Sequence, residues 1–111
     1  MRFLLYETGQ NARPSAPPSQ QVLDEVAKLT EETKRSGILL ATGGLAPASA
    51  RVRSAGGKLA VTDGPFTETK ELTGGFALIE VKSREEAVEG AKRFRKIVGD
   101  GESVIQEVFG G

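Results

Sequence analysis

A segment past the middle of the chain combines a carboxylate with residues that stiffen the backbone. It reads VTDGPFTETKE over residues 61–71. Gly64 precedes a proline and is pushed toward extended geometry, while Pro65 fixes its own φ and offers no N–H. Asp63 can accept hydrogen bonds from nearby backbone N–H groups, as in an Asx turn. Such a loop can hold Asp63 as a general base, as a ligand anchor or as a turn former.

Cationic and aromatic side chains elsewhere could complete a site around this carboxylate. Arg51 and Arg53 alternate onto one face of a predicted strand, where they grip an anionic ligand together or decorate an exposed hairpin. Tyr6 points either into a cavity covered by the sheet or into the core, and the core is the preferred interpretation. Asp63 is the candidate catalytic residue. The candidate ligand-binding residues are Tyr6, Arg51, Arg53, Asp63, Gly64, Pro65, Phe66, Lys70 and Glu71.

Other charged residues of the same segment allow two interpretations each. Lys70 either pairs with Asp63 or faces solvent, and the sequence leaves both open. Glu68 and Glu71 either join Asp63 in a carboxylate cluster or form a solvated loop face, which is the commoner role of such charges.

The composition excludes several kinds of chemistry. The 111 residues include no cysteine and no histidine, which argues against a zinc site and excludes Cys–His and Ser–His nucleophile pairs. Carboxylates could hold Mg²⁺ or Mn²⁺, but no ligand spacing favours such a site. We therefore expect no metal and no cofactor. The 15 basic and 15 acidic residues balance, which argues against direct binding to nucleic acid or to a membrane surface. A short apolar start and the lack of a membrane-length apolar stretch predict a cytoplasmic protein.

Local patterns divide the chain into eight elements. Ser19 is expected to cap the first helix, and Ser83 with Glu86 matches the S-x-x-E capping box of the second. Gly43-Gly44 is expected to end a strand, and Gly56-Gly57 predicts a tight hairpin turn. The predicted strands cover 2–8, 38–41, 50–55, 58–62, 75–82 and 103–109, the helices cover 19–36 and 83–98, and loops cover 9–18 and 63–73.

This order predicts one α+β domain over residues 1–111. With the 50–62 hairpin treated as an insertion, the order reduces to βαββαβ, the ferredoxin-like pattern, with both helices on one face of the sheet. The strands at 2–8, 38–41 and 75–82 are apolar on both faces. A sheet with one wet face should alternate cleanly, so we predict that a second copy covers the other face in a homodimer. The alternative is a partly apolar face left exposed.

The segment VTDGPFTETKE, with GGF shortly after it, resembles the signature of the YCII-related family, specifically its DGPF group. The similarity extends from about Gly37 to Phe109 and includes GILLATGGLAP, ARVRSAGGK, IEVKSREEA and IQEVF. Earlier residues match in pattern more than in letters. The resemblance implies a ferredoxin-like fold that pairs into a dimeric α/β barrel.

The resemblance implies less about function. Some relatives carry a histidine and an aspartate proposed as an active-site pair, and Asp63 takes the position of the acidic residue. This chain has Ala46 where relatives often have a histidine, and Gln106 where they often place an arginine in the last strand. Many DGPF members are encoded beside extracytoplasmic-function sigma factors, which implies a regulatory connection.

Three hypotheses follow. The first is a ligand-binding or regulatory domain with a pocket at a dimer cleft, lined by Asp63, Arg51, Arg53 and Tyr6. The second is a lyase- or isomerase-like enzyme in which Asp63 accepts a proton and an arginine holds substrate charge. The third is an interaction module for a sigma factor without a small ligand. The first is preferred because the missing histidine removes the best proton shuttle at neutral pH.

Overall fold

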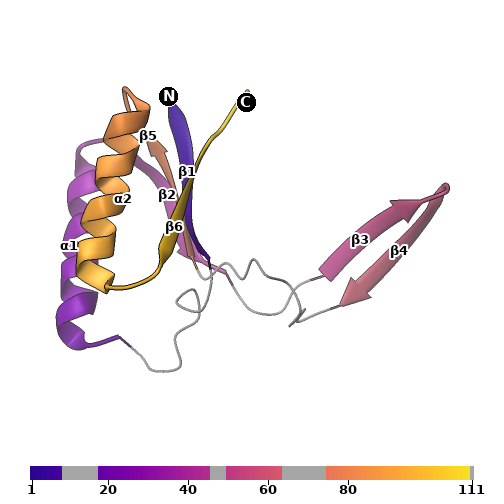
Figure 1. Cartoon of the computed structure of the whole chain (residues 1–111), viewed down its shortest axis with the longest axis horizontal. Helices are drawn as coiled ribbons and strands as arrows, with labels where there is room; N and C mark the ends of the chain where they lie inside the picture. The colour runs from indigo at the N-terminus through magenta and orange to yellow at the C-terminus, as the bar shows by residue number, and fades with distance from the viewer. Residues whose placement is uncertain (9–17, 46–49, 64–74, 111) are drawn as a thin grey trace.

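The chain forms an α+β domain in the computed structural model, which describes residues 1–8, 18–45, 50–63 and 75–110 (Figure 1). The eight elements come in the predicted order of strands and helices. They are β1 (Arg2–Thr8), α1 (Gln20–Arg35), β2 (Leu39–Gly44), β3 (Ala50–Ala55), β4 (Lys58–Asp63), β5 (Gly75–Glu80), α2 (Arg84–Val98) and β6 (Glu102–Glu107).

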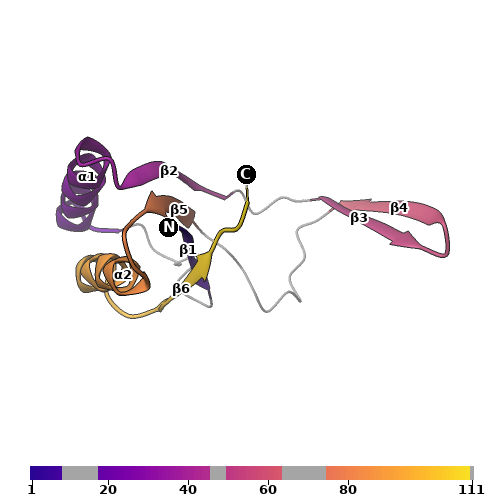
Figure 2. The same ribbon diagram turned by 90° about the horizontal axis from the view of Figure 1, so that it is seen from above.

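Four of the strands form one antiparallel sheet in the order β2-β5-β1-β6. The central strand β1 pairs with β5 on one side, where Leu4 lies opposite Leu78, and with β6 on the other, where Leu5 lies opposite Ile105. Without the β3–β4 hairpin this is the βαββαβ arrangement predicted from the sequence. Both helices cover the same face of the sheet, as Figure 2 shows.

The helix ends follow the local signals in the sequence. The Ser19 hydroxyl accepts a backbone N–H in the first turn of α1 at 3.2 Å, and the Ser83 hydroxyl accepts the Glu86 N–H at 3.2 Å. Gly37 follows α1 with φ +81°, and Gly99 caps α2 with φ +91°, so each helix ends at left-handed backbone that favours glycine. None of the helices in the described ranges is long and apolar enough to cross a membrane.

The core is small and lies between the sheet and the helices. Helix α1 contributes no buried residue, because the residues of its apolar stripe, Val22, Val26 and Leu29, are only half-buried. Helix α2 contributes two alanines. The buried apolar residues of the described chain are Phe3, Ile79, Val81, Ala87 and Ala91. The buried contacts between the helix layer and the sheet therefore come mainly from α2.

The second strand ends at the Gly43-Gly44 pair, as predicted, but it extends past the predicted last residue, Ala41. Strand β2 runs through Gly44, with Gly43 opposite Phe76 and Gly44 opposite Gly75. A Cβ at Gly43 would lie 3.2 Å from Cε1 of Phe76, so the aromatic ring packs over the glycine. The neighbouring strand thus supplies the side-chain packing that Gly43 lacks, and pairing continues.

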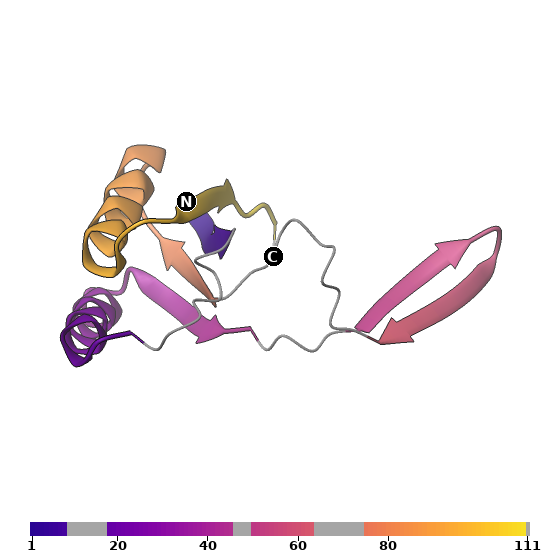
Figure 3. The ribbon, with the colours of Figure 1, turned by 60° about the horizontal axis from the view of Figure 1, so that its bottom comes forward.

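Strands β3 and β4 form a separate hairpin that projects away from the four-stranded sheet, as Figure 3 shows. Gly56 and Gly57 have φ values of +55° and +79°, which a type I′ turn requires, and the predicted hairpin turn is confirmed. Every residue of both strands is exposed. The radius of gyration is 16.0 Å, against about 13 Å for a compact chain of this length. The hairpin is therefore an arm and not a part of the core.

Candidate functional site

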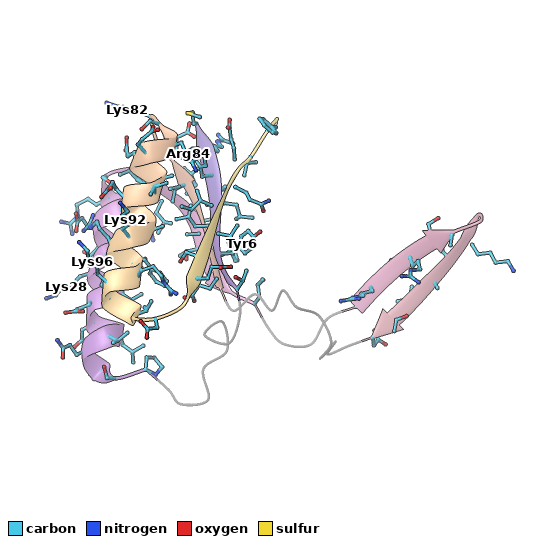
Figure 4. The ribbon with its side chains drawn as sticks, viewed as in Figure 1. Tyr6, Lys28, Lys82, Arg84, Lys92 and Lys96 are labelled. Carbon is cyan, nitrogen blue, oxygen red and sulfur yellow. The ribbon has the colours of Figure 1, made fainter. Side chains whose placement is uncertain are left out.

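Tyr6 lies on the sheet face that points away from the helices, which we call the open face. Phe3 and Leu5 of the same strand belong to the core, so strand alternation places Tyr6 on the other side. Figure 4 shows its side chain there. Its hydroxyl donates to Oε1 of Gln106 at 2.8 Å. The preferred placement of Tyr6 in the core is wrong, because a strand that is apolar on both faces does not reveal which face meets the helices.

The open face is apolar at its centre and polar at its margins. Its half-buried central side chains, beside Tyr6, are Leu4, Phe76, Leu78 and Val104. At the margins, Arg2 lies 3.5 Å from Glu80 and the Thr8 hydroxyl donates to Glu102 at 2.6 Å. No element of the described ranges packs against this face (Figure 2). The predicted apolarity of both sheet faces is confirmed for β1 and β5.

The hairpin has two chemically different faces. Val52 lies opposite Val61, and Ala50 lies opposite Asp63, so directly paired residues place Asp63 on an aliphatic face that also carries Leu59. Arg51 and Arg53 share the other face with Lys58, as their spacing predicts. The hairpin therefore separates Asp63 from the two arginines by turning them to opposite sides.

The described part of one chain does not assemble the predicted ligand-binding set into one pocket. Tyr6 belongs to the four-stranded sheet, whereas Arg51, Arg53 and Asp63 belong to the projecting arm (Figure 1). Five further candidates, Gly64, Pro65, Phe66, Lys70 and Glu71, lie outside the described residues, as does Glu68. Among the described residues, no group of three or more acidic, histidine or cysteine side chains is placed to hold a metal ion.

The sequence reasoning missed an ion pair between the sheet and α2. Arg95 donates through Nη2 to the Glu7 carboxylate, and the two side chains are only 19% and 22% exposed. Nε and Nη1 of Arg95 are buried and have no hydrogen-bond partner in the described ranges. A signal was present, since Glu7 shares its strand face with Phe3 and Leu5 and therefore points toward the helix layer.

These features define a class of protein, an α+β domain of ferredoxin-like pattern with an exposed apolar sheet face. The sequence profile of the YCII-related domain matches residues 1–108, and the chain belongs to this family. An uncharacterised protein of Rhizobium meliloti (strain 1021) is 34% identical over 80 residues, which is 70% of this chain and 64% of that protein. The match thus spans less than two thirds of that relative's length.

A solved structure shares the fold. It is the 5-chloro-2-hydroxyhydroquinone dehydrochlorinase TftG of Burkholderia phenoliruptrix AC1100 in complex with 2,5-dihydroxybenzoquinone. The two structures superpose with a TM-score of 0.53 over 100% of this chain and 96% of that chain, at 21% sequence identity. At this identity the likeness establishes the fold alone.

Proposed function

We propose that this chain is a small-molecule-binding or regulatory domain of the DGPF group, with its ligand held in a cleft between the open faces of two copies. The observation that carries the proposal is the open face itself. Leu4, Phe76, Leu78 and Val104 form an apolar centre around one hydrogen-bonded polar pair, Tyr6 and Gln106. Ligand sites commonly combine apolar walls with a few fixed polar groups in this way.

The accessible surface of the chain supports pairing. One chain exposes 8265 Å², against roughly 5,900 Å² for a compact monomer of its mass. The excess is larger than the ~800 Å² that each partner buries in an interface of standard size. A second copy that covers the open face and the arm would remove part of this surface from water.

The arm supports pairing independently. Val52, Leu59 and Val61 are 69%, 75% and 68% exposed on one hairpin face, and an isolated two-stranded hairpin is marginally stable in water. We propose that this aliphatic face packs on the second copy. Asp63 shares that face and would turn toward the cleft, whereas Arg51 and Arg53 would turn away from it. The carboxylate is then a better candidate contact than the arginines.

For the ligand we propose a small ring compound that carries acidic oxygens. The Tyr6 hydroxyl is bound to Oε1 of Gln106, which leaves the Gln106 amide N–H groups to face an acceptor on a ligand. The structural neighbour binds a dihydroxybenzoquinone on the same fold, which makes that compound a suitable first probe.

The test is a calorimetric titration of the full chain with 2,5-dihydroxybenzoquinone. We expect binding to wild type and at least tenfold weaker binding to Tyr6→Phe, which removes the hydroxyl and keeps the ring. Lys96→Gln, on the exposed side of α2, is the matched control and should bind as wild type does. Equal binding by Tyr6→Phe, or no binding by wild type at millimolar quinone, would contradict the proposal.

A lyase- or isomerase-like enzyme that uses Asp63 as a general acid or base is the second candidate. It is favoured by the name of the structural neighbour, a dehydrochlorinase. Asp63→Asn separates the two functions. If Asp63→Asn loses turnover but still binds the ligand, Asp63 acts as a general acid or base in an enzyme. If a folded Asp63→Asn loses both turnover and binding, Asp63 anchors the ligand. The link to a sigma factor stays a prediction, which copurification with that factor would test.

A further inference from the structure

A pocket of about 380 Å³ lies between the helix layer and the sheet, on the side opposite the open face. It differs from the cleft proposed above, because most of its walls come from the helix-facing side of the sheet and from the two helices seen in Figure 2, although Tyr6 and Phe76 also border it. The wall residues on which the argument depends are Leu5, Ala77 and Ile79 of the sheet, Leu29 of α1, and Gly90 and Phe94 of α2. We call this space the interlayer pocket.

The interlayer pocket offers little to a charged ligand. Arg93, the one cation among the described lining residues, already lies 3.0 Å from Glu32. The acidic side chains of the lining, Glu7, Glu86 and Glu89, would repel an anion, and each already accepts from a donor of the chain, so they are not free to attract a cation. An occupant must therefore be uncharged or lose favourable interactions with water on entry.

Two threonine hydroxyl groups in the lining are also engaged. The Thr33 hydroxyl donates to the backbone carbonyls of Leu29 and Thr30 at 2.8 and 3.1 Å. The Thr42 hydroxyl donates to the carbonyl of Phe76 at 2.9 Å. Both donors are used within the protein, so these threonines offer a ligand only acceptor positions, and beside its apolar residues and the hydroxyls of Thr30 and Ser103 the interlayer pocket is a mainly apolar space.

Gly90 is the point at which the interlayer pocket is left open. It lies on the same face of α2 as Ala87, Ala91 and Phe94, and a Cβ built on it meets no heavy atom within 4 Å. Glycine is the poorest ordinary helix former, so its place in the middle of α2 has no local structural reason. The missing side chain contributes to the volume between α1, α2 and the sheet.

We infer that the interlayer pocket binds a small uncharged aromatic molecule of one or two rings, and that Gly90 keeps it open. Apolar cavities of about 150 Å³ already accept benzene, and ligand pockets begin at about 300 Å³. This site needs only one chain and does not depend on the dimer cleft.

The experiment uses indole as the neutral probe and follows the methyl signals of leucine, isoleucine and valine by NMR. Indole should shift the signals of Leu5, Leu29 and Ile79 and leave those of Leu4 and Leu78 on the open face in place. The anion indole-3-acetate should bind at least tenfold more weakly. Shifts confined to Leu4 and Leu78 would place the indole site on the open face and overturn the inference.

The variant Gly90→Leu fills the interlayer pocket and should weaken indole binding at least tenfold without lowering the melting temperature. Lys96→Leu adds the same side chain to an exposed position of the same helix and should bind indole as wild type does. Tight binding by a folded Gly90→Leu would overturn the inference. If that variant does not fold, xenon under pressure in wild-type crystals decides the matter. Density between Leu29 and Phe94 supports the site, and its absence there overturns it.

Discussion

The Glu7–Arg95 pair joins β1 to α2 at the edge of the core. One carboxylate oxygen meets one guanidinium nitrogen, while two other nitrogens of Arg95 are buried without a partner in the described ranges. A partly satisfied charge in such a place is costly once its counter-charge is removed. Removing the Glu7 carboxylate would leave the Arg95 charge mostly buried without a counter-charge. We expect this cost to exceed the stability that the intact pair contributes.

We predict that Glu7→Gln lowers the free energy of unfolding by about 1–3 kcal/mol, because the Arg95 charge loses its counter-ion in a mostly buried place. Urea unfolding measures the loss. The control is Glu31→Gln, which breaks a pair with Arg35 whose side chains are 71% and 78% exposed. It should change stability by less than about 0.5 kcal/mol. If the two substitutions lower the free energy of unfolding equally, the buried pair contributes no more to stability than the exposed pair.

The secondary-structure elements differ in how far their local sequence determines where they begin, where they end and what they pack against. Helix α2 has a serine cap, acidic residues in its first turn, basic residues in its last turn and a glycine at its end. The arm has a two-glycine turn and clean alternation, but its Val52, Leu59 and Val61 lack a surface to cover them within the described chain. Local signals suffice to start and stop both elements, and only the helix also finds its packing partner in the same chain.

We expect Ser83→Ala to destabilise the protein by about 1 kcal/mol, because the Glu86 backbone N–H loses its acceptor at the start of α2. Thermal unfolding followed by circular dichroism measures the effect. Ser54→Ala, an exposed serine in the arm, should leave the melting temperature unchanged. A loss as large for Ser54→Ala as for Ser83→Ala would argue against the cap as the cause.

At the scale of the whole molecule, the open face and the arm both favour contact with a second copy of the chain. Both are apolar, both lie outside the core, and no element of the described ranges covers either of them. Large exposed apolar patches are uncommon on proteins that work as monomers.

We predict that wild type sediments as a dimer at micromolar concentration and that Leu78→Glu sediments as a monomer, because a charge at the centre of the open face cannot be buried in an interface. Leu23→Glu is the matched control, since Leu23 is a 48% exposed leucine on α1, away from the open face. It should stay dimeric. A monomeric wild type would remove the basis of the proposed cleft and would leave the interlayer pocket untouched.

Much of the fold follows from local patterns. The serines that cap the helices, the glycines that end them and the Gly56-Gly57 turn act within a few residues, so the sequence specifies them directly. Apolar alternation shows which residues share a strand face, and it correctly placed Arg51 with Arg53 and indicated a sheet that is apolar on both sides. The predicted strand stopped at Ala41 and missed the pairing of Thr42, Gly43 and Gly44, because the packing of Phe76 over Gly43 comes from a residue more than thirty positions away.

The sequence by itself determined the elements, their order, the family and the two-sided apolarity of the sheet, because each depends on short-range periodicity or on a contiguous motif. Only the tertiary structure decided that Tyr6 faces away from the helices, that Asp63 and the arginines lie on opposite faces of an arm, and that Glu7 meets Arg95. Alternation says which side chains lie together on a face. Which face meets the helices, and which strand lies beside which, depends on the packing of the whole sheet, where residues far apart in sequence exclude water together.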